Sequence, residues 1–213
     1  MMRHARTTDQ FPDSAIARQA EALLRSTSRP ALVNHCLRSY RWGVELARIE
    51  KIAFDPEVLF VAAALHDVGL EHRFDTGAAF EDDGGRVVQE LAWDHGWTAE
   101  RVHAAREAVE RHIAPMITLD LGPEAYLLWH ATGLDVSGHR LGEVAGPVAA
   151  RGLAEHPWLD FTDHFRDLFL LQAQVKPWSR ARELVDAGLL DRLAASPLSH
   201  SHAADSATGV NQT

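Results

Sequence analysis

The sequence predicts an all-α protein with a single domain. Apolar residues recur at helical spacing through most of the chain, and proline, glycine and short polar residues separate these stretches. No alternating strand pattern, Asn-Gly hairpin or internal repeat stands beside them. With 213 residues the chain is long enough for one well-packed core, and nothing in it requires a second domain. We therefore expect a helical bundle.

Composition excludes several classes of function. Hydrophobic residues make up 46% and charged residues 24% of the chain, and no apolar run approaches the roughly 20 residues of a membrane span. The first ten residues lack the apolar segment of a secretory signal, so we expect a cytoplasmic protein without a membrane partner. The net charge of −9 argues against nucleic-acid binding. The single cysteine, Cys36, excludes an internal disulfide and is expected to be a packing residue.

The amino-terminal half of the chain is expected to contain three helices. Residues 1–11 are polar, and we expect them to be flexible. Apolar residues at helical spacing and prolines at the starts give helices over residues 12–26, 30–52 and 56–68, and Gly69 supplies the stop of the third. His35 lies within the apolar set of the second helix.

The third helix carries the most unusual feature of the sequence. Its apolar run ends in VAAALHDVGL, which places His66 and Asp67 in the last turn before Gly69. Neighbouring residues on a helix point about 100° apart, so both side chains reach one point only in a groove between helices. A metal ion suits that point, because the helix C-terminus carries partial negative charge. The alternative is a buried His–Asp pair whose polar atoms are satisfied within the protein.

The carboxy-terminal half is expected to contain five more helices, separated by polar segments. Acidic residues including Glu81 open a helix over 81–95, and a helix over 98–113 carries His112 on its buried stripe. The next helix begins at Gly122-Pro123-Glu124, runs through AYLLWHATGLDVSG and presents Asp135 on an apolar side. Residues 138–157 are expected to be loop with short helical pieces. They precede helices over 160–175 and 179–195 and a disordered tail over 196–213.

Acids and imidazoles therefore occur on the buried stripes of several separate helices. Buried ionisable groups need partners, and His35, His66, Asp67 and Asp135 are most simply explained if they share one. Two imidazoles and two carboxylates suit one divalent metal ion. We expect zinc, with Fe, Mn, Co or Ni as alternatives and with positions left for water. His112 is a fourth such site on a core face.

The order of these residues resembles the H…HD…D signature of the HD-domain superfamily, an all-helical group of metal-dependent hydrolases. The resemblance covers about residues 31–142 and implies an HD-type bundle over 12–195. It also implies that His35, His66, Asp67 and Asp135 are metal ligands.

Within that superfamily the chain resembles the cyanamide hydratase-like branch in the blocks NHCLRSYRWG, DPEVLFVAAALHDVGL, FEDDGGRVV, RHIAP and GLDVSG. This resemblance implies a single metal ion whose bound water adds to a nitrile-type carbon and converts cyanamide to urea. Asp67 and His112 would then be catalytic, with His112 positioning substrate or donating a proton. Glu81 is a further candidate donor, although an acid that opens a helix also has a capping role.

Two departures and two alternatives accompany that interpretation. Phe80 stands where dinuclear members carry a histidine, and Leu70 stands where nucleotidase members carry an acid. A phosphohydrolase of nucleotides or phosphomonoesters is the first alternative, with Arg38 or Arg111 available for phosphate. An inactive, metal-stabilised binding module is the second. We expect a small-molecule substrate, and an apolar surface on the last two helices is compatible with a homodimer.

Overall fold

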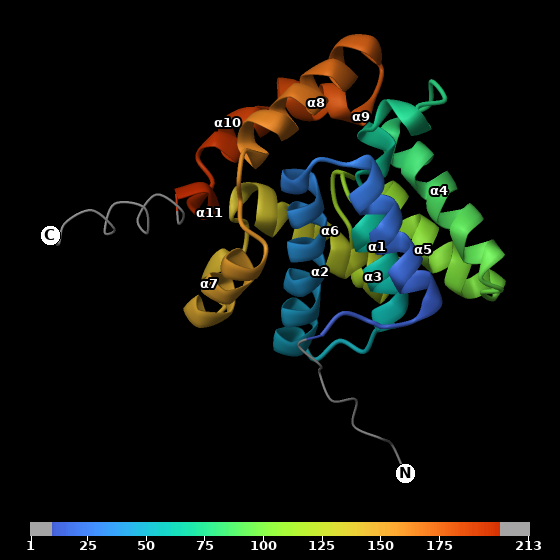
Figure 1. The fold of residues 1–213 in the computed structure, drawn as a ribbon. Helices are drawn as coiled ribbons and strands as arrows, with labels where there is room; N and C mark the ends of the chain where they lie inside the picture. Colours follow the sequence, from blue (N-terminus) through green and yellow to red (C-terminus); the bar gives the residue numbers. More distant parts are fainter. Residues whose placement is uncertain (1–9, 201–213) are drawn as a thin grey trace, which may run out of the picture.

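The computed structural model describes residues 10–200, which form helices and connecting turns with no β-strand among them (Figure 1). The predicted all-α fold is confirmed. No helix within this described part of the chain has the length and apolar character needed to cross a membrane. Cys36 is fully buried, and burial raises the pKa of its thiol well above the usual value.

The second and third helices begin at the predicted prolines, whereas the first begins three residues later than predicted. Helix α1 spans Ala15–Thr27, and the Ser14 side chain accepts a hydrogen bond from the backbone of its first turn. Helices α2 (Pro30–Glu50) and α3 (Pro56–Leu65) each begin with proline. In front of α3, Asp55 accepts backbone hydrogen bonds from the two residues that follow Pro56.

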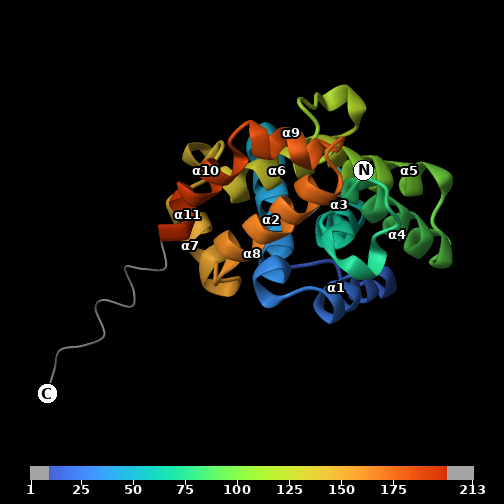
Figure 2. The same ribbon diagram turned by 90° about the horizontal axis from the view of Figure 1, so that it is seen from above.

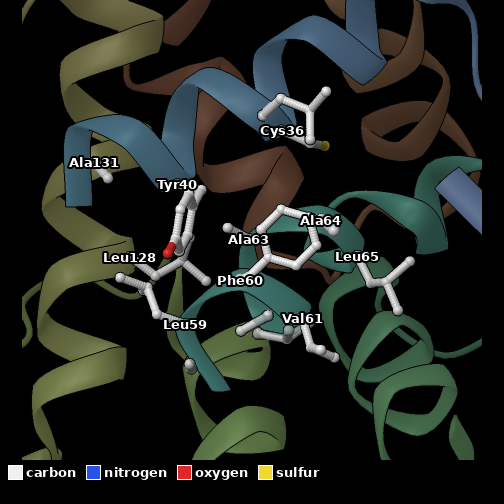
Figure 3. Close-up of a cluster of buried hydrophobic side chains, with 14 of the residues drawn as sticks. Cys36, Tyr40, Leu59, Phe60, Val61, Ala63, Ala64, Leu65, Leu128 and Ala131 are labelled. Carbon is white, nitrogen blue, oxygen red and sulfur yellow. The ribbon is translucent and has the colours of Figure 1, made fainter. Parts of the chain in front are cut away.

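Helix α3 lies at the centre of the fold and packs against α1, α2, α5 (Ala99–Arg111) and α6 (Pro123–Ser137) (Figure 2). Every side chain over residues 58–65 is buried, as expected for a helix that is apolar on all sides. Phe60 of α3 lies against Tyr40 of α2, with ring centroids 5.2 Å apart (Figure 3). This packing holds the end of α3 at a fixed place in the interior.

The third helix ends earlier than predicted. It ends at Leu65, and the 3₁₀ turns η1 (Val68–Leu70) and η2 (His72–Phe74) follow. The turn at Gly69 passes close under helix α4 (Phe80–Asp94): a Cβ atom on Gly69 would lie 2.0 Å from the Phe80 carbonyl oxygen. Gly69 is therefore needed for a close backbone approach, and not only as the helix stop that the sequence predicts.

The carboxy-terminal segment is more helical and more divided than predicted. Helix α7 (Gly146–Glu155) occupies half of the segment predicted as loop with short helical pieces, and α8 (Phe161–Val175) follows as expected. The single helix predicted over 179–195 is two helices, α9 (Arg180–Asp186) and α10 (Leu189–Ala194), because Gly188 between them has a positive φ of 78°. Helix α8 packs against α2 and η1, and α10 packs against α6.

The two terminal segments predicted to be flexible each include residues that are packed against the folded protein. Phe11 contacts Phe60 and Tyr40, with ring centroids 5.2 and 5.6 Å away. Ser196 and Leu198 are buried, and a short helix α11 (Pro197–His200) forms at this point. These residues are ordered because apolar neighbours are available to cover them. The rest of the two predicted segments, residues 1–9 and 201–213, lies outside the described residues.

Candidate metal centre

Three of the four predicted ligands meet where α2 crosses the end of α3. The Nε2 atoms of His35 and His66 lie 3.1 Å apart. One carboxylate oxygen of Asp67, Oδ2, lies 3.4 Å from the His35 Nε2 atom and 3.2 Å from the His66 Nε2 atom. All three side chains are buried, and His66 reaches this point as the residue that caps the end of α3. We refer to these residues as the HHD cluster.

Hydrogen bonds behind the HHD cluster fix the protons of both imidazoles. The Nδ1 atom of His66 lies 2.8 Å from the Ala63 carbonyl oxygen, which only accepts, so Nδ1 carries the proton. The Nδ1 atom of His35 lies 2.7 Å from a carboxylate oxygen of Asp135 and donates to it. Each neutral ring therefore turns the lone pair of its Nε2 atom toward the cluster.

The inward-facing atoms of the cluster are consequently all electron-pair donors. The Asp67 Oδ2 atom is buried and has no hydrogen-bond partner among the described residues. Uncompensated buried acceptors are costly, and a cation among them removes that cost. Burial acts to lower the pKa of His35, but the Asp135 and Asp67 carboxylates outweigh it and raise that pKa. The same negative field favours a divalent cation, so the residues present fit a metal ion.

His112 lies beside the HHD cluster, as the sequence predicts for a residue on a buried stripe. Its Nε2 atom is 3.4 Å from the second carboxylate oxygen of Asp67, and its ring centroid is 4.8 Å from that of His66. Its Nδ1 atom donates to the Val109 carbonyl oxygen at 2.6 Å. The Nε2 atom is buried and has no hydrogen-bond partner among the described residues, so a fourth lone pair faces the same space.

Asp135, predicted as the fourth ligand, lies behind His35 and outside the HHD cluster. Its Oδ2 atom accepts from His35 and from Arg38 Nη2, and its Oδ1 atom accepts from Arg38 Nε and from Trp42 Nε1. Burial acts to raise the pKa of Asp135, but the Arg38 charge outweighs it and holds that pKa well below the usual value. These partners direct the carboxylate toward the Nδ1 side of His35, which is a common arrangement behind a metal-binding imidazole.

Arg38 is the residue that the sequence interpretation placed wrongly. Its expected availability for phosphate is wrong, because its side chain is fully buried and paired with Asp135. Its position three residues after His35 places both on one side of α2, and this spacing is the signal that was present in the sequence.

Glu81, predicted as a catalytic residue, is not brought into the cluster. It lies in the first turn of α4, where burial raises its pKa and its Oε2 atom has no hydrogen-bond partner among the described residues. The N-cap of this helix is Ala79, and no side chain caps it. The acids at this point lie in the first turn, where the partial positive charge of the helix end favours them.

A cavity of about 350 Å³ opens beside the HHD cluster and His112. Its wall includes the aromatic side chains of Trp129, Phe165 and Phe169. Two arginines, Arg180 and Arg192, also line it and come from α9 and α10. The sequence interpretation missed these two, because nothing in the metal-ligand pattern indicates which distant helix closes the site.

A comparison with known protein families matches the part of the chain that contains this candidate site. The sequence model of the HD domain family matches residues 32–144, which include the HHD cluster, His112 and Asp135. No curated protein matches the chain.

Proposed function

The chain belongs to the HD domain family, and from this premise we propose that it is a metal-dependent hydratase or hydrolase that adds water to a small nitrile-type substrate, with cyanamide converted to urea as the reaction to test first. The observation that carries the proposal is the meeting of the His35, His66 and Asp67 acceptor atoms within 3.1–3.4 Å of one another beside a cavity. The cyanamide assignment rests on the sequence blocks shared with the hydratase-like branch.

The HHD cluster would hold the metal ion. Two imidazole nitrogens and one carboxylate oxygen form a ligand set used by catalytic zinc sites, in which a further position is left for water. When bound, a divalent ion lowers the pKa of water from about 16 toward 7 and so supplies hydroxide at neutral pH. We propose zinc, with Fe, Mn, Co or Ni as alternatives that accept the same ligands.

His112 is proposed to move the proton that the reaction requires. Water addition to a nitrile forms a carbon–oxygen bond, and the nitrogen that receives the electron pair must be protonated. The His112 Nε2 atom lies 3.4 Å from Asp67 and has no other described partner, so its lone pair can take up the proton that the attacking water releases and pass it to that nitrogen. The hydrogen bond from Nδ1 to Val109 fixes the direction of the ring.

Aromatic side chains are proposed to keep bulk water from the centre. Phe161 stacks on His35 with ring centroids 4.6 Å apart, and Phe165 contacts the same imidazole at 5.8 Å. This apolar cover reduces the local dielectric constant and strengthens the attraction between the cluster and a cation.

Hydrolysis of a phosphomonoester is the second candidate function, and one observation favours it. Arg180 and Arg192 line the cavity, and arginine is well suited to hold a phosphate group. Arg38, the first residue considered for this role, is committed to Asp135.

Product assays separate these candidates. Zinc-loaded protein is supplied with cyanamide, and urea is measured, while phosphate release is measured with phosphomonoesters. We expect urea from the wild type and from His103→Ala, whose exposed site on α5 makes it a matched control for His112→Ala. Loss of proton transfer should reduce the rate of His112→Ala by about 10²–10⁴-fold.

Phosphate release without urea would support the second candidate. Bound metal with neither product across a broad substrate panel would favour a binding module.

A further inference from the structure

The cavity beside the HHD cluster has two walls of different origin. One wall comes from the region that matches the HD family, and the other comes from α8, α9 and α10, which follow residue 144. The second wall contributes Phe165, Phe169, Leu184 and Leu189 together with Arg180 and Arg192. The features of this wall therefore belong to the carboxy-terminal helices and not to the metal-binding core.

The fixed charges on the cavity wall favour an anion. Asp67 is the only acidic residue that lines the described cavity, and it belongs to the HHD cluster. Arg192 donates to the Ala187 carbonyl oxygen at 2.7 Å and forms no salt bridge with a described acidic residue. Arg192 is an exposed residue on the cavity wall, where its charge attracts negatively charged groups.

Arg180 is held in a defined position at the same wall. Its Nε atom donates to the Ile113 carbonyl oxygen at 3.0 Å. Ile113 directly follows His112 in the chain. The Arg180 Nη1 atom pairs with Glu183 at 2.6 Å, which offsets part of its charge. Two guanidinium groups with one carboxylate partner leave the wall with a net positive charge.

The size and lining of the cavity indicate a ligand larger than cyanamide. A volume of about 350 Å³ falls in the range of roughly 300–1,000 Å³ that accommodates drug-sized molecules. Aromatic and leucine side chains line the space alongside the arginines. A ligand that fills it would have an apolar body as well as a charged group.

We propose that the protein binds small organic anions, with the carboxylate or phosphate group at Arg180 and Arg192 and the apolar body against Phe165, Phe169 and Leu189. The position of the reacting bond at the HHD cluster rests on the proposed function, whereas anion binding does not require it. Arg180 and Arg192 are then specificity-determining residues, and the carboxy-terminal helices select the substrate.

Binding measurements with three probes of similar shape test this assignment. Benzoate, phenylphosphonate and neutral benzamide are titrated by calorimetry into the full chain, both as wild type and as the metal-site variant His66→Ala. We expect both anions to bind, with affinity decreasing as salt is added, and benzamide to bind at least about tenfold more weakly. The stronger of the two anions identifies carboxylate or phosphate as the preferred group.

Arginine variants locate the binding site. Arg180→Gln and Arg192→Gln should each weaken binding of the preferred anion about tenfold, while Arg180→Lys should retain part of it. Arg182→Gln is the matched control, because Arg182 also lies on α9 but pairs with Asp186 and does not line the cavity. Unfolding temperatures, measured in parallel, show whether a variant is folded.

Two results would overturn the assignment. One is benzamide binding as tightly as benzoate. The other is unchanged anion affinity in a folded Arg192→Gln protein. This second result includes the case in which phenylphosphonate binding is lost in His66→Ala but is unchanged in the arginine variants. If the wild-type protein binds the anions but binds no metal, the proposed function is contradicted and the inference of anion binding stands.

Discussion

The Nε2 atoms of His35 and His66 lie 3.1 Å apart, although each ring donates its Nδ1 proton to a different acceptor behind it. Two lone pairs at this distance repel each other, and the nearby Asp67 carboxylate adds negative charge. A cation bound among these atoms would relieve that repulsion. This relationship underlies the assignment of a metal centre.

Asp135 and Asp67 are expected to differ in their effect on metal binding. Asp67→Asn removes charge from the HHD cluster itself and should abolish stoichiometric zinc binding. Asp135→Asn alters only the support behind His35 and should weaken zinc affinity about 10–100-fold. Competition with a chromophoric chelator measures both affinities. Equal and complete loss in the two variants would show that Asp135 is a direct ligand.

Arg38→Met provides the control for that comparison. This substitution removes the guanidinium group that pairs with Asp135 and changes no residue of the HHD cluster. Leaving Asp135 buried with a charge and no guanidinium should reduce the free energy of unfolding by about 3–5 kcal/mol. If the zinc affinities of folded Arg38→Met and Asp135→Asn proteins fall together, the effect comes from the ion pair and not from lost coordination.

Gly69→Ala is expected to disturb the metal centre without changing any polar group. The new Cβ atom would lie 2.0 Å from the Phe80 carbonyl oxygen, so α4 and the turn after Asp67 must separate. We expect the free energy of unfolding to fall by about 1–3 kcal/mol, together with zinc affinity. Gly142→Ala is the control, because its Cβ atom meets open space and should change stability by less than about 0.5 kcal/mol. Denaturant unfolding of the two variants checks this, and equal stability would contradict the packing described.

His156 is expected to make the protein sensitive to mild acid. Burial, together with the charges of Arg41, Arg38 and Arg25, lowers its pKa from 6.5 to about 4. Above pH 6.5 the ring is neutral in both the folded and unfolded states. Between pH 6.5 and about 4 only the unfolded chain takes up a proton here, so stability decreases as the pH falls.

The variant His156→Asn should remove that contribution. Its unfolding temperature should depend less on pH between 6.5 and 4 than that of the wild type, as followed by circular dichroism. His103→Asn, at an exposed histidine on α5, serves as the control and should behave as the wild type does. Parallel curves for His156→Asn and the wild type would show that His156 does not contribute in this pH range.

The local signals in the sequence account for much of the fold. Asp55 and Pro56 begin α3 where predicted, because capping depends only on neighbouring residues. The same local interpretation extended α3 past its true end, since the turn at Gly69 is set by contact with α4. The division between α9 and α10 at Gly188 was also missed, although the glycine was present as a signal.

The site was predictable only in part for the same reason. The burial of His35, His66 and Asp67 follows from apolar periodicity, and the structure brings their donor atoms together. The place of Asp135 depends on Arg38 and Trp42, whose pairing across helices is not visible in a single sequence. The cavity wall from α9 and α10 is likewise a tertiary feature.

Metal content shows most directly whether His35, His66 and Asp67 form a metal centre. Purified wild type, His66→Ala and the exposed-site control His103→Ala are incubated with zinc, freed of excess ion and subjected to elemental analysis. We predict about one divalent ion per chain for the wild type and for His103→Ala, and almost none for His66→Ala. Equal and near-zero metal in all three proteins would contradict the assignment of His35, His66 and Asp67 as a metal centre.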